Sequence, residues 1–234
     1  MAFDAGPAPD CADCPRLAAF RAANRAGYPE WSNAPVASFG ESDARLMIVG
    51  LAPGLRGANR TGRPFTGDYA GDLLYRTLIE FGFASGTYDR RPDDGLRLVD
   101  CAIVNAVRCV PPQNKPTPQE IATCRRYLTP AISALPRLRI MLALGRIAHE
   151  SALRAIKLSP AKFPFAHGSR HALALGQFCL FDSYHCSRYN TNTGVLTEAM
   201  FREVFASIRA ELDGRAKDER LERGLPDSKW SVTT

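Results

Sequence analysis

Four short apolar runs, each followed by residues with helical spacing, constrain the fold of this chain more than any other feature. They lie at 46–49, 98–107, 139–145 and 178–184. The first is apolar at every position, which is typical of a strand buried on both faces, as in a parallel sheet. The alternation of strands and helices predicts an α/β fold, namely a three-layer α/β/α sandwich with a central, mainly parallel four-stranded sheet.

Turn and cap signals predict the helices and the domain limits. Helices are expected at 15–27, at 72–81, from Thr117 toward Leu135, after residue 145 through Ile156, and at 196–212. Thr117 followed by a proline and then by Glu120 is a helix-start signature, whereas Pro130 is expected to kink or split that helix. The chain turns to charged residues after position 214. We therefore expect a single domain over 1–214 and a charged, flexible C-terminal tail over 215–234.

Composition and charge exclude some classes of protein. The 234 residues are 45% hydrophobic and 23% charged, as in an ordinary globular protein. No apolar run approaches the roughly 18 residues of a membrane helix, and the first nine residues lack the pattern of a secretion signal. We therefore expect a cytoplasmic protein without a membrane segment. Its 30 basic against 24 acidic residues, a net charge of +6, suggest a polyanionic partner.

The cysteines indicate a metal centre rather than disulfides, because seven thiols in a long, cytosolic-looking chain make a poor disulfide scaffold. Cys11 and Cys14 form a C-x2-C pair, and fourteen residues separate Cys109 from Cys124. Four thiolates can hold a [4Fe–4S] cluster or a structural zinc ion. The alternative is that Cys109 and Cys124 are small core residues. The spacing by itself leaves these interpretations open.

A glycine-rich segment at 50–71 follows the first predicted strand, and loops longer than about 12–15 residues are usually functional or disordered. Its arginines, Arg56, Arg60 and Arg63, are candidate contacts for phosphate groups. Phe65 is a candidate for stacking on a nucleobase, or else it anchors the loop. Asp68 is a candidate catalytic base, or else a loop-capping residue.

Several segments together resemble the family 5 (type b) uracil-DNA glycosylases. Residues 50–53, 57–63 and 65–68 resemble the first motif of that family, 185–194 resemble the second, and 105–109 with 111–112 and 115–118 match the part between. The matches occur in chain order and span about residues 11–212. The resemblance implies a DNA repair enzyme that flips uracil out of DNA and hydrolyses its N-glycosidic bond, leaving an abasic site. It also implies activity on hypoxanthine or xanthine, and a [4Fe–4S] cluster at the four cysteines.

The same resemblance implies roles for individual side chains. Phe65 would stack on the flipped base, and the amide of Asn105 would pair with the edge of that base. Asp68 would orient a water molecule and offset the charge on the sugar, while His185 would donate a hydrogen bond to the departing base. The candidates for substrate contact are Gly50, Ala52, Phe65 and Asn190. The candidates for DNA contact are Arg56, Arg60, Arg63 and Arg188.

The chain also departs from the pattern of the family. Cys186 replaces the usual proline of the second motif, and Tyr189 replaces the usual glutamine. Asp72, one helical turn beyond Asp68, is a competing candidate for the key carboxylate, or else a helix cap. The alternative functions are a non-catalytic binder of single-stranded or damaged DNA on the same fold, and a zinc-stapled nucleotide hydrolase. We expect a monomer that needs no protein partner.

Overall fold

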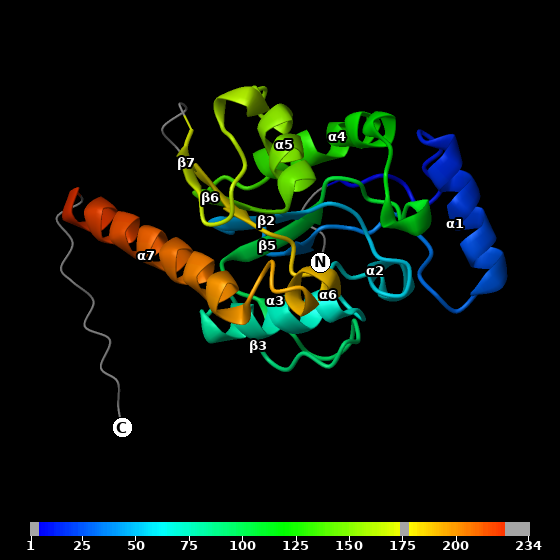
Figure 1. Ribbon diagram of the computed structural model, residues 1–234, viewed down its shortest axis with the longest axis horizontal. Coiled ribbons are helices and arrows are strands. Elements are labelled where there is room, and N and C mark those ends of the chain that lie inside the picture. Colours follow the sequence, from blue (N-terminus) through cyan, green and yellow to red (C-terminus); the bar gives the residue numbers. More distant parts are fainter. Residues whose placement is uncertain (1–4, 174–177, 223–234) are drawn as a thin grey trace.

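A computed structural model describes residues 5–173 and 178–222. Its centre is a six-stranded sheet in the order β1-β5-β2-β6-β8-β7 (Figure 1). The strands are β1 Phe39–Gly40, β2 Leu46–Gly50, β5 Cys101–Asn105, β6 Ile140–Leu144, β7 Arg170–Ala172 and β8 Cys179–Ser183. The inner four are parallel, whereas β1 and β7 pair antiparallel at the two edges. The prediction of four strands was therefore too low, because the short edge strands carry no continuous apolar run.

Helices lie on both faces of this sheet, as predicted (Figure 1), and the chain has shorter or peripheral helices besides these. The helices are α1 Pro15–Gly27, α2 Ala58–Thr61, α3 Tyr69–Glu80, α4 Pro118–Ser133, α5 Arg146–Ala155, α6 Arg188–Asn192 and α7 Glu198–Glu222. Alternate residues of each inner strand enter two different cores. On β2, Leu46 and Ile48 join the core beneath α3 and α7, while Met47 and Val49 join the core beneath α4 and α5. This period of two, with both sides apolar, explains why the run 46–49 is continuous.

Three predictions about the helices were wrong. Helix α3 begins at Tyr69 rather than at residue 72. Pro130 does not split α4, which continues to Ser133. Since the proline lies in the last turn of the helix, its ring and missing N–H disturb little of the hydrogen-bond ladder. Helix α7 extends to Glu222, beyond both the predicted end at 212 and the predicted start of the tail at 215. Residues 223–234 lie outside the described part of the chain. In the described ranges, no helix is long and apolar enough to cross a bilayer.

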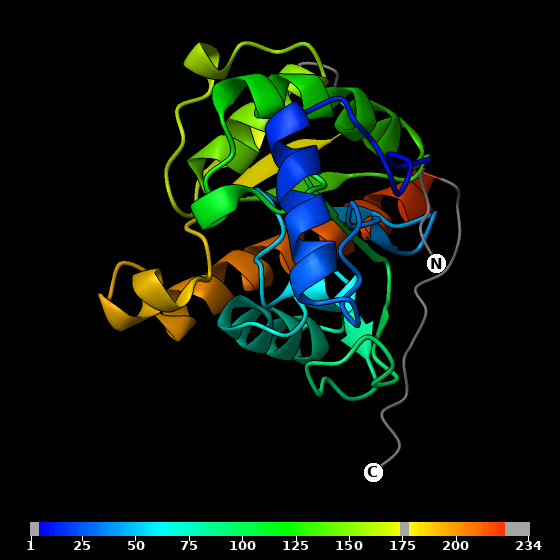
Figure 2. The ribbon, with the colours of Figure 1, turned by 90° about the vertical axis from the view of Figure 1, so that its right-hand side faces the viewer.

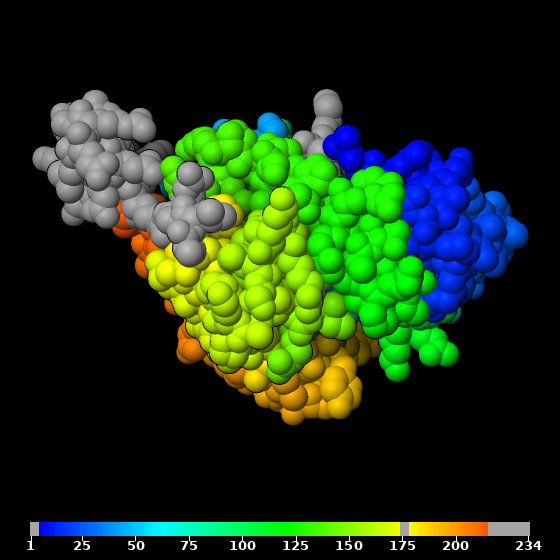
Figure 3. Space-filling view, turned by 90° about the horizontal axis from the view of Figure 1, so that it is seen from above, coloured from blue at the N-terminus to red at the C-terminus, as the bar shows by residue number. Residues whose placement is uncertain are grey.

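A second, two-stranded hairpin lies outside the main sheet. It consists of β3, Ala84–Ser85, and β4, Arg97–Leu98, joined by the loop 86–96. The hairpin follows α3 and lies below it in Figure 1. Helix α1 covers one end of the molecule, at the right of Figure 1 and in front in Figure 2. There its residues lie beside those of the α4 region, as the adjoining blue and green surfaces show in Figure 3.

A buried polar cluster joins α5, β7 and β8. The two carboxylate oxygens of Asp182 accept hydrogen bonds from His149 Nδ1 at 2.7 Å and from His171 Nε2 at 2.9 Å. The second ring nitrogen of His149 lies 2.8 Å from the carbonyl oxygen of Phe163. Both ring nitrogens of His149 thus lie at hydrogen-bond distance from an oxygen atom. The cluster ties the segment after α5 to the strand that leads into the second motif.

Candidate active site

The carboxyl ends of β2 and β5 bring the first predicted site residues together. Gly50 is in register with Asn105 on the neighbouring parallel strand, so the following loops leave the sheet at the edge where α/β proteins bind ligands. Gly50 has no room for a side chain, because a Cβ there would lie 2.3 Å from Asn105 Oδ1 and 2.8 Å from Phe65 Cζ. The glycine therefore allows the Asn105 amide and the Phe65 ring to meet at the sheet edge.

The loop after β2 folds back over this edge around α2 and a tight turn at Phe65. Phe65 has a φ of +51° and is 7% exposed. Its ring stacks on the imidazole of His185, with the ring centroids 5.9 Å apart and an angle of 29° between the planes. The ring therefore lies between the end of β2 and the second motif, which approaches from the end of β8.

Asp68 occupies the N-cap of α3, where its carboxylate accepts a hydrogen bond from the Gly71 N–H at 3.3 Å. The loop-capping interpretation is therefore correct as a description of its local bonding, and the cap that we considered for Asp72 belongs to Asp68. The carboxylate also lies against the backbone of Gly57, where a Cβ would come within 2.2 Å of Asp68 Oδ2. Burial raises the pKa of Asp68, against the opposing effect of backbone hydrogen bonds from Gly71 and Ala70.

Asp72 has a different environment from that of Asp68. It forms an ion pair with Arg90 at 2.6 Å on the outer side of α3, with 28% of its side chain exposed. A partly exposed pair of this kind adds little to stability, and its oxygens are engaged by the guanidinium. Of the two competing carboxylates, Asp68 is the one that lies on the glycine-rich loop beside Gly54 and Gly57.

His185 lies in the segment after β8 and faces the Phe65 ring. Burial lowers its pKa from 6.5 to about 4, because the charged imidazolium is poorly solvated there. At neutral pH the side chain is thus uncharged, with one nitrogen as a donor and the other as an acceptor. A neutral imidazole can donate one hydrogen bond to an oxygen that gains negative charge.

The second motif is held in place by its own side chains. Asn190 Nδ2 donates a hydrogen bond to the carbonyl oxygen of His185 at 2.8 Å, so this amide shapes the loop. Ser187 caps α6 by accepting a hydrogen bond from the N–H of Asn190. Cys186 is fully buried and its thiol lies 3.4 Å from the carbonyl oxygen of Ala70. The thiol packs the motif against the start of α3.

The four candidate arginines divide into two kinds. Arg56 and Arg60 in the first loop and Arg188 on α6 are exposed, and the guanidinium of Arg188 lies 5.3 Å from the ring of Tyr69. Arg63 is only 6% exposed and forms a bidentate ion pair with Asp94. Its Nη1 and Nη2 atoms each lie 2.8 Å from one carboxylate oxygen. The structure thus corrects the prediction that Arg63 contacts DNA, because its donors are already used inside the protein.

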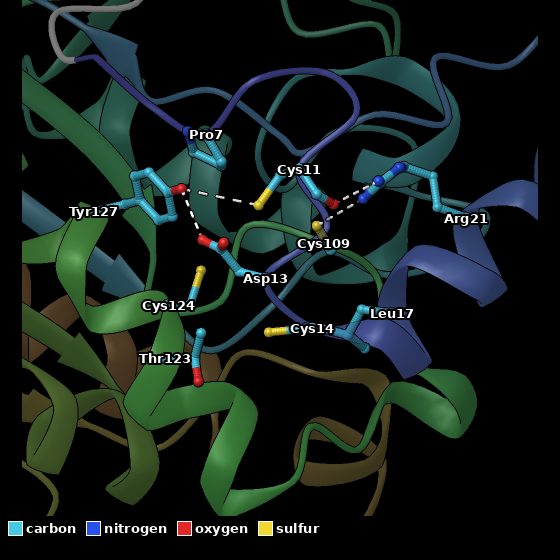
Figure 4. A pocket seen from close by; sticks show the side chains of 10 residues that line it. All are labelled: Pro7, Cys11, Asp13, Cys14, Leu17, Arg21, Cys109, Thr123, Cys124 and Tyr127. Carbon is cyan, nitrogen blue, oxygen red and sulfur yellow. Dashed lines mark hydrogen bonds between the residues drawn. The ribbon is translucent and has the colours of Figure 1, made fainter.

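The four cysteines of the predicted metal centre surround one small pocket. Their sulfur atoms point into a common space in Figure 4, from the segment before α1, from the start of α1, from the loop after β5 and from α4. Ala52 packs against this region, so the segment after β2 borders both this pocket and the Phe65 site. Cys101 and Cys179 are buried in strands, away from this pocket.

The groups around the pocket match negatively charged sulfur. The buried guanidinium of Arg21 donates a hydrogen bond to Cys109 Sγ at 3.4 Å, and the backbone N–H of Arg108 donates one to Cys124 Sγ at 3.4 Å. Four cysteine side chains around one pocket are a donor set that a [4Fe–4S] cluster or a structural zinc ion can use.

Comparison with known proteins assigns the chain to a family. A sequence profile of the uracil DNA glycosylase superfamily matches residues 37–209, and the chain belongs to that superfamily. A type-5 uracil-DNA glycosylase from Thermus thermophilus is 47% identical over 205 residues, which cover 85% of this chain and 92% of that protein. The relative from Pyrobaculum aerophilum is 36% identical over 86% of this chain and 89% of that protein. Within the superfamily, the chain is a member of the type-5 family.

The structure also shows one group of site neighbours that sequence patterns did not single out. The hairpin loop 86–96 contributes Tyr88 and Asp94, which contact the backbone at Phe65 and the side chain of Arg63. Neither residue lies in a motif. A single tyrosine in a polar loop carries no signal that it would fold against a segment 23 positions earlier.

Proposed function

We propose that this chain is a DNA repair enzyme that hydrolyses the N-glycosidic bond of uracil in DNA and leaves an abasic site. The observation that carries the proposal is the meeting of Phe65 and Asn105 at Gly50, with His185 stacked on the Phe65 ring. An aromatic face, an amide and a neutral imidazole are thereby gathered at the carboxyl edge of a parallel sheet. The assignment to the type-5 family supports the same reaction.

The enzyme would recognise the base after it has flipped out of the DNA duplex, because the N-glycosidic bond cannot be reached inside the duplex. The Phe65 ring offers a stacking surface. The Asn105 amide offers one acceptor and two donors, which match the N3–H and the O4 of uracil. Hypoxanthine and xanthine present a similar pair of N–H and C=O groups, so we extend the proposal to these deaminated purines.

Bond breakage places positive charge on the sugar and negative charge on the departing base. Asp68 would orient the attacking water and offset the sugar charge with its carboxylate. His185 would donate a hydrogen bond to the base oxygen as charge develops there. The low pKa of His185 suits a neutral donor. The raised pKa of Asp68 makes its carboxylate a better proton acceptor than an exposed aspartate.

The DNA backbone would bind the exposed basic groups near this site. Arg56, Arg60 and Arg188 are the candidates that remain after Arg63 is assigned to the interior. Each phosphate contact releases condensed counterions, so affinity would fall steeply as salt rises. Asn190 would act by holding the second motif rather than by reaching the base, since its amide binds the carbonyl of His185.

We also propose that Cys11, Cys14, Cys109 and Cys124 hold a [4Fe–4S] cluster. Such a cluster would serve this protein by joining the segment before α1 to the β5 loop and to α4. The buried guanidinium of Arg21 donates hydrogen bonds to Cys109 Sγ and to the carbonyl oxygen of Cys11. Its positive charge would compensate part of the negative charge of the thiolates. No part of the hydrolysis is assigned to the cluster.

An excision assay on short oligonucleotides tests the proposed reaction. Each oligonucleotide carries one uracil, hypoxanthine, xanthine or normal base, and alkaline cleavage reports the abasic product. We expect cleavage at uracil by the purified chain and its loss in Asp68→Asn. Tight binding to these oligonucleotides without any abasic product would instead support the non-catalytic binder.

A further inference from the structure

The backbone that carries Phe65 adopts a costly conformation. Phe65 has a φ of +51°, and Gly67, two residues later, has a φ of +94°. A left-handed conformation is cheap for glycine but costs a residue with a side chain about 1–2 kcal/mol. The orientation of the Phe65 ring depends on this turn, because the ring leaves the chain inside it. Contacts from the rest of the protein must therefore stabilise this turn.

The hydroxyl group of Tyr88 spans the turn. It donates a hydrogen bond to the carbonyl oxygen of Phe65 at 3.2 Å and accepts one from the N–H of Gly67 at 3.4 Å. One side-chain atom thus binds the backbone on both sides of Thr66. Burial raises the pKa of Tyr88 to about 12, so the hydroxyl keeps its proton at neutral pH.

The position of Tyr88 is itself defined by its neighbours. Its ring packs on that of Tyr75, with centroids 4.6 Å apart. Asp94 holds the loop that carries Tyr88. Its carboxylate pairs with Arg63 and accepts a hydrogen bond from the N–H of Asp89. Gly71 permits the close approach, because a Cβ there would lie 1.9 Å from the Phe65 carbonyl oxygen and 2.3 Å from the Tyr88 hydroxyl.

We propose that Tyr88 is a positioning residue for base recognition, whose hydroxyl holds the Phe65 turn so that the phenylalanine ring presents its face to the flipped base. The hairpin loop 86–96 is thereby part of the recognition machinery, although it does not touch the base. This inference rests on the proposed function, because it concerns the ring that would stack on uracil.

Replacement of the hydroxyl alone tests the proposal. Tyr88→Phe keeps the ring on Tyr75 and removes both hydrogen bonds to the turn. We expect the single-turnover excision of uracil to fall about tenfold, the scale of one or two lost hydrogen bonds. The inhibition constant of free uracil should rise by a similar factor, whereas affinity for an abasic-site duplex should stay at the parental value. Tyr28→Phe, a surface tyrosine that is 39% exposed, is the matched control and should behave as the parent.

A double-mutant cycle separates positioning of the ring from a general structural role. If Tyr88 acts through the Phe65 ring, Tyr88→Phe should have no further effect in a Phe65→Ala background. An equal loss in both backgrounds, an unchanged inhibition constant for uracil or a parental excision rate would each overturn the proposal. A parental protein that does not excise uracil at all would instead refute the proposed function, whereas excision by the parent with an inert Tyr88→Phe variant refutes only this inference.

Discussion

Asp68→Asn separates the structural role of this residue from its chemical role. Asparagine caps a helix about as well as aspartate, so the bond to the Gly71 N–H, 3.3 Å in the parent, should persist. The substitution removes only the negative charge. We expect single-turnover excision of uracil to fall by about 10²–10⁴, which corresponds to about 3–5 kcal/mol of lost transition-state stabilisation. DNA affinity should stay near the parental value.

The same substitution should stabilise the protein at neutral pH. Burial raises the pKa of Asp68 above its ordinary value of 3.8, so the folded state disfavours the charged form relative to the unfolded state. Above both pKa values this difference lowers the stability of the parent, and below 3.8 it disappears because both states are protonated. Asp68→Asn should therefore raise the free energy of unfolding at pH 7, and the gain should vanish as the pH falls toward 3.

Single-turnover kinetics measure the change in excision rate, and chemical denaturation at several pH values measures the change in the free energy of unfolding. Asp72→Asn is the matched control, because it removes a neighbouring carboxylate that pairs with Arg90 on the outer side of the same helix. It should change the excision rate little. A destabilised Asp68→Asn variant with the parental excision rate would refute our reasoning and leave Asp68 as a helix cap alone. Loss of excision in Asp72→Asn but not in Asp68→Asn would mean that we assigned the wrong carboxylate.

Five further expectations follow from the site. Asn105→Ala should weaken the excision of uracil by about 1–3 kcal/mol through an unpaired base edge, measured in the same assay. Anaerobically purified protein should contain iron and labile sulfide, and Cys109→Ser should lose both together with solubility. Arg60→Ala should reduce the salt dependence of DNA binding, while Arg63→Ala should cost about 3–5 kcal/mol of stability because Asp94 is left buried without its partner. Since the pKa of His185 is lowered to about 4, stability should decline as the pH falls from 6.5 toward 4, and His185→Gln should flatten that decline.

Local patterns in the sequence were sufficient for the centre of the fold. The run 46–49 forms a strand buried on both faces, and Thr117 with Glu120 forms the predicted capping box. The motif residues Phe65, Asn105 and His185, which are far apart in the chain, meet at the predicted edge of the sheet. These features are readable because strand periodicity, helix caps and the placement of loops at strand ends depend on neighbours in the sequence or on a rule common to parallel sheets.

The tertiary structure decided which polar groups are free to act. Arg56, Arg60 and Arg63 look equivalent in the glycine-rich loop, yet Arg63 is buried because the distant hairpin loop supplies Asp94. In the same way, Asp72 pairs with Arg90 from the hairpin loop, and the Tyr88 hydroxyl reaches the Phe65 turn. The edge strands β1 and β7 form only because β5 and β8 offer unpaired backbone groups. In each case a partner many residues away determines the outcome, and no local pattern encodes the energy of a contact that folding alone creates.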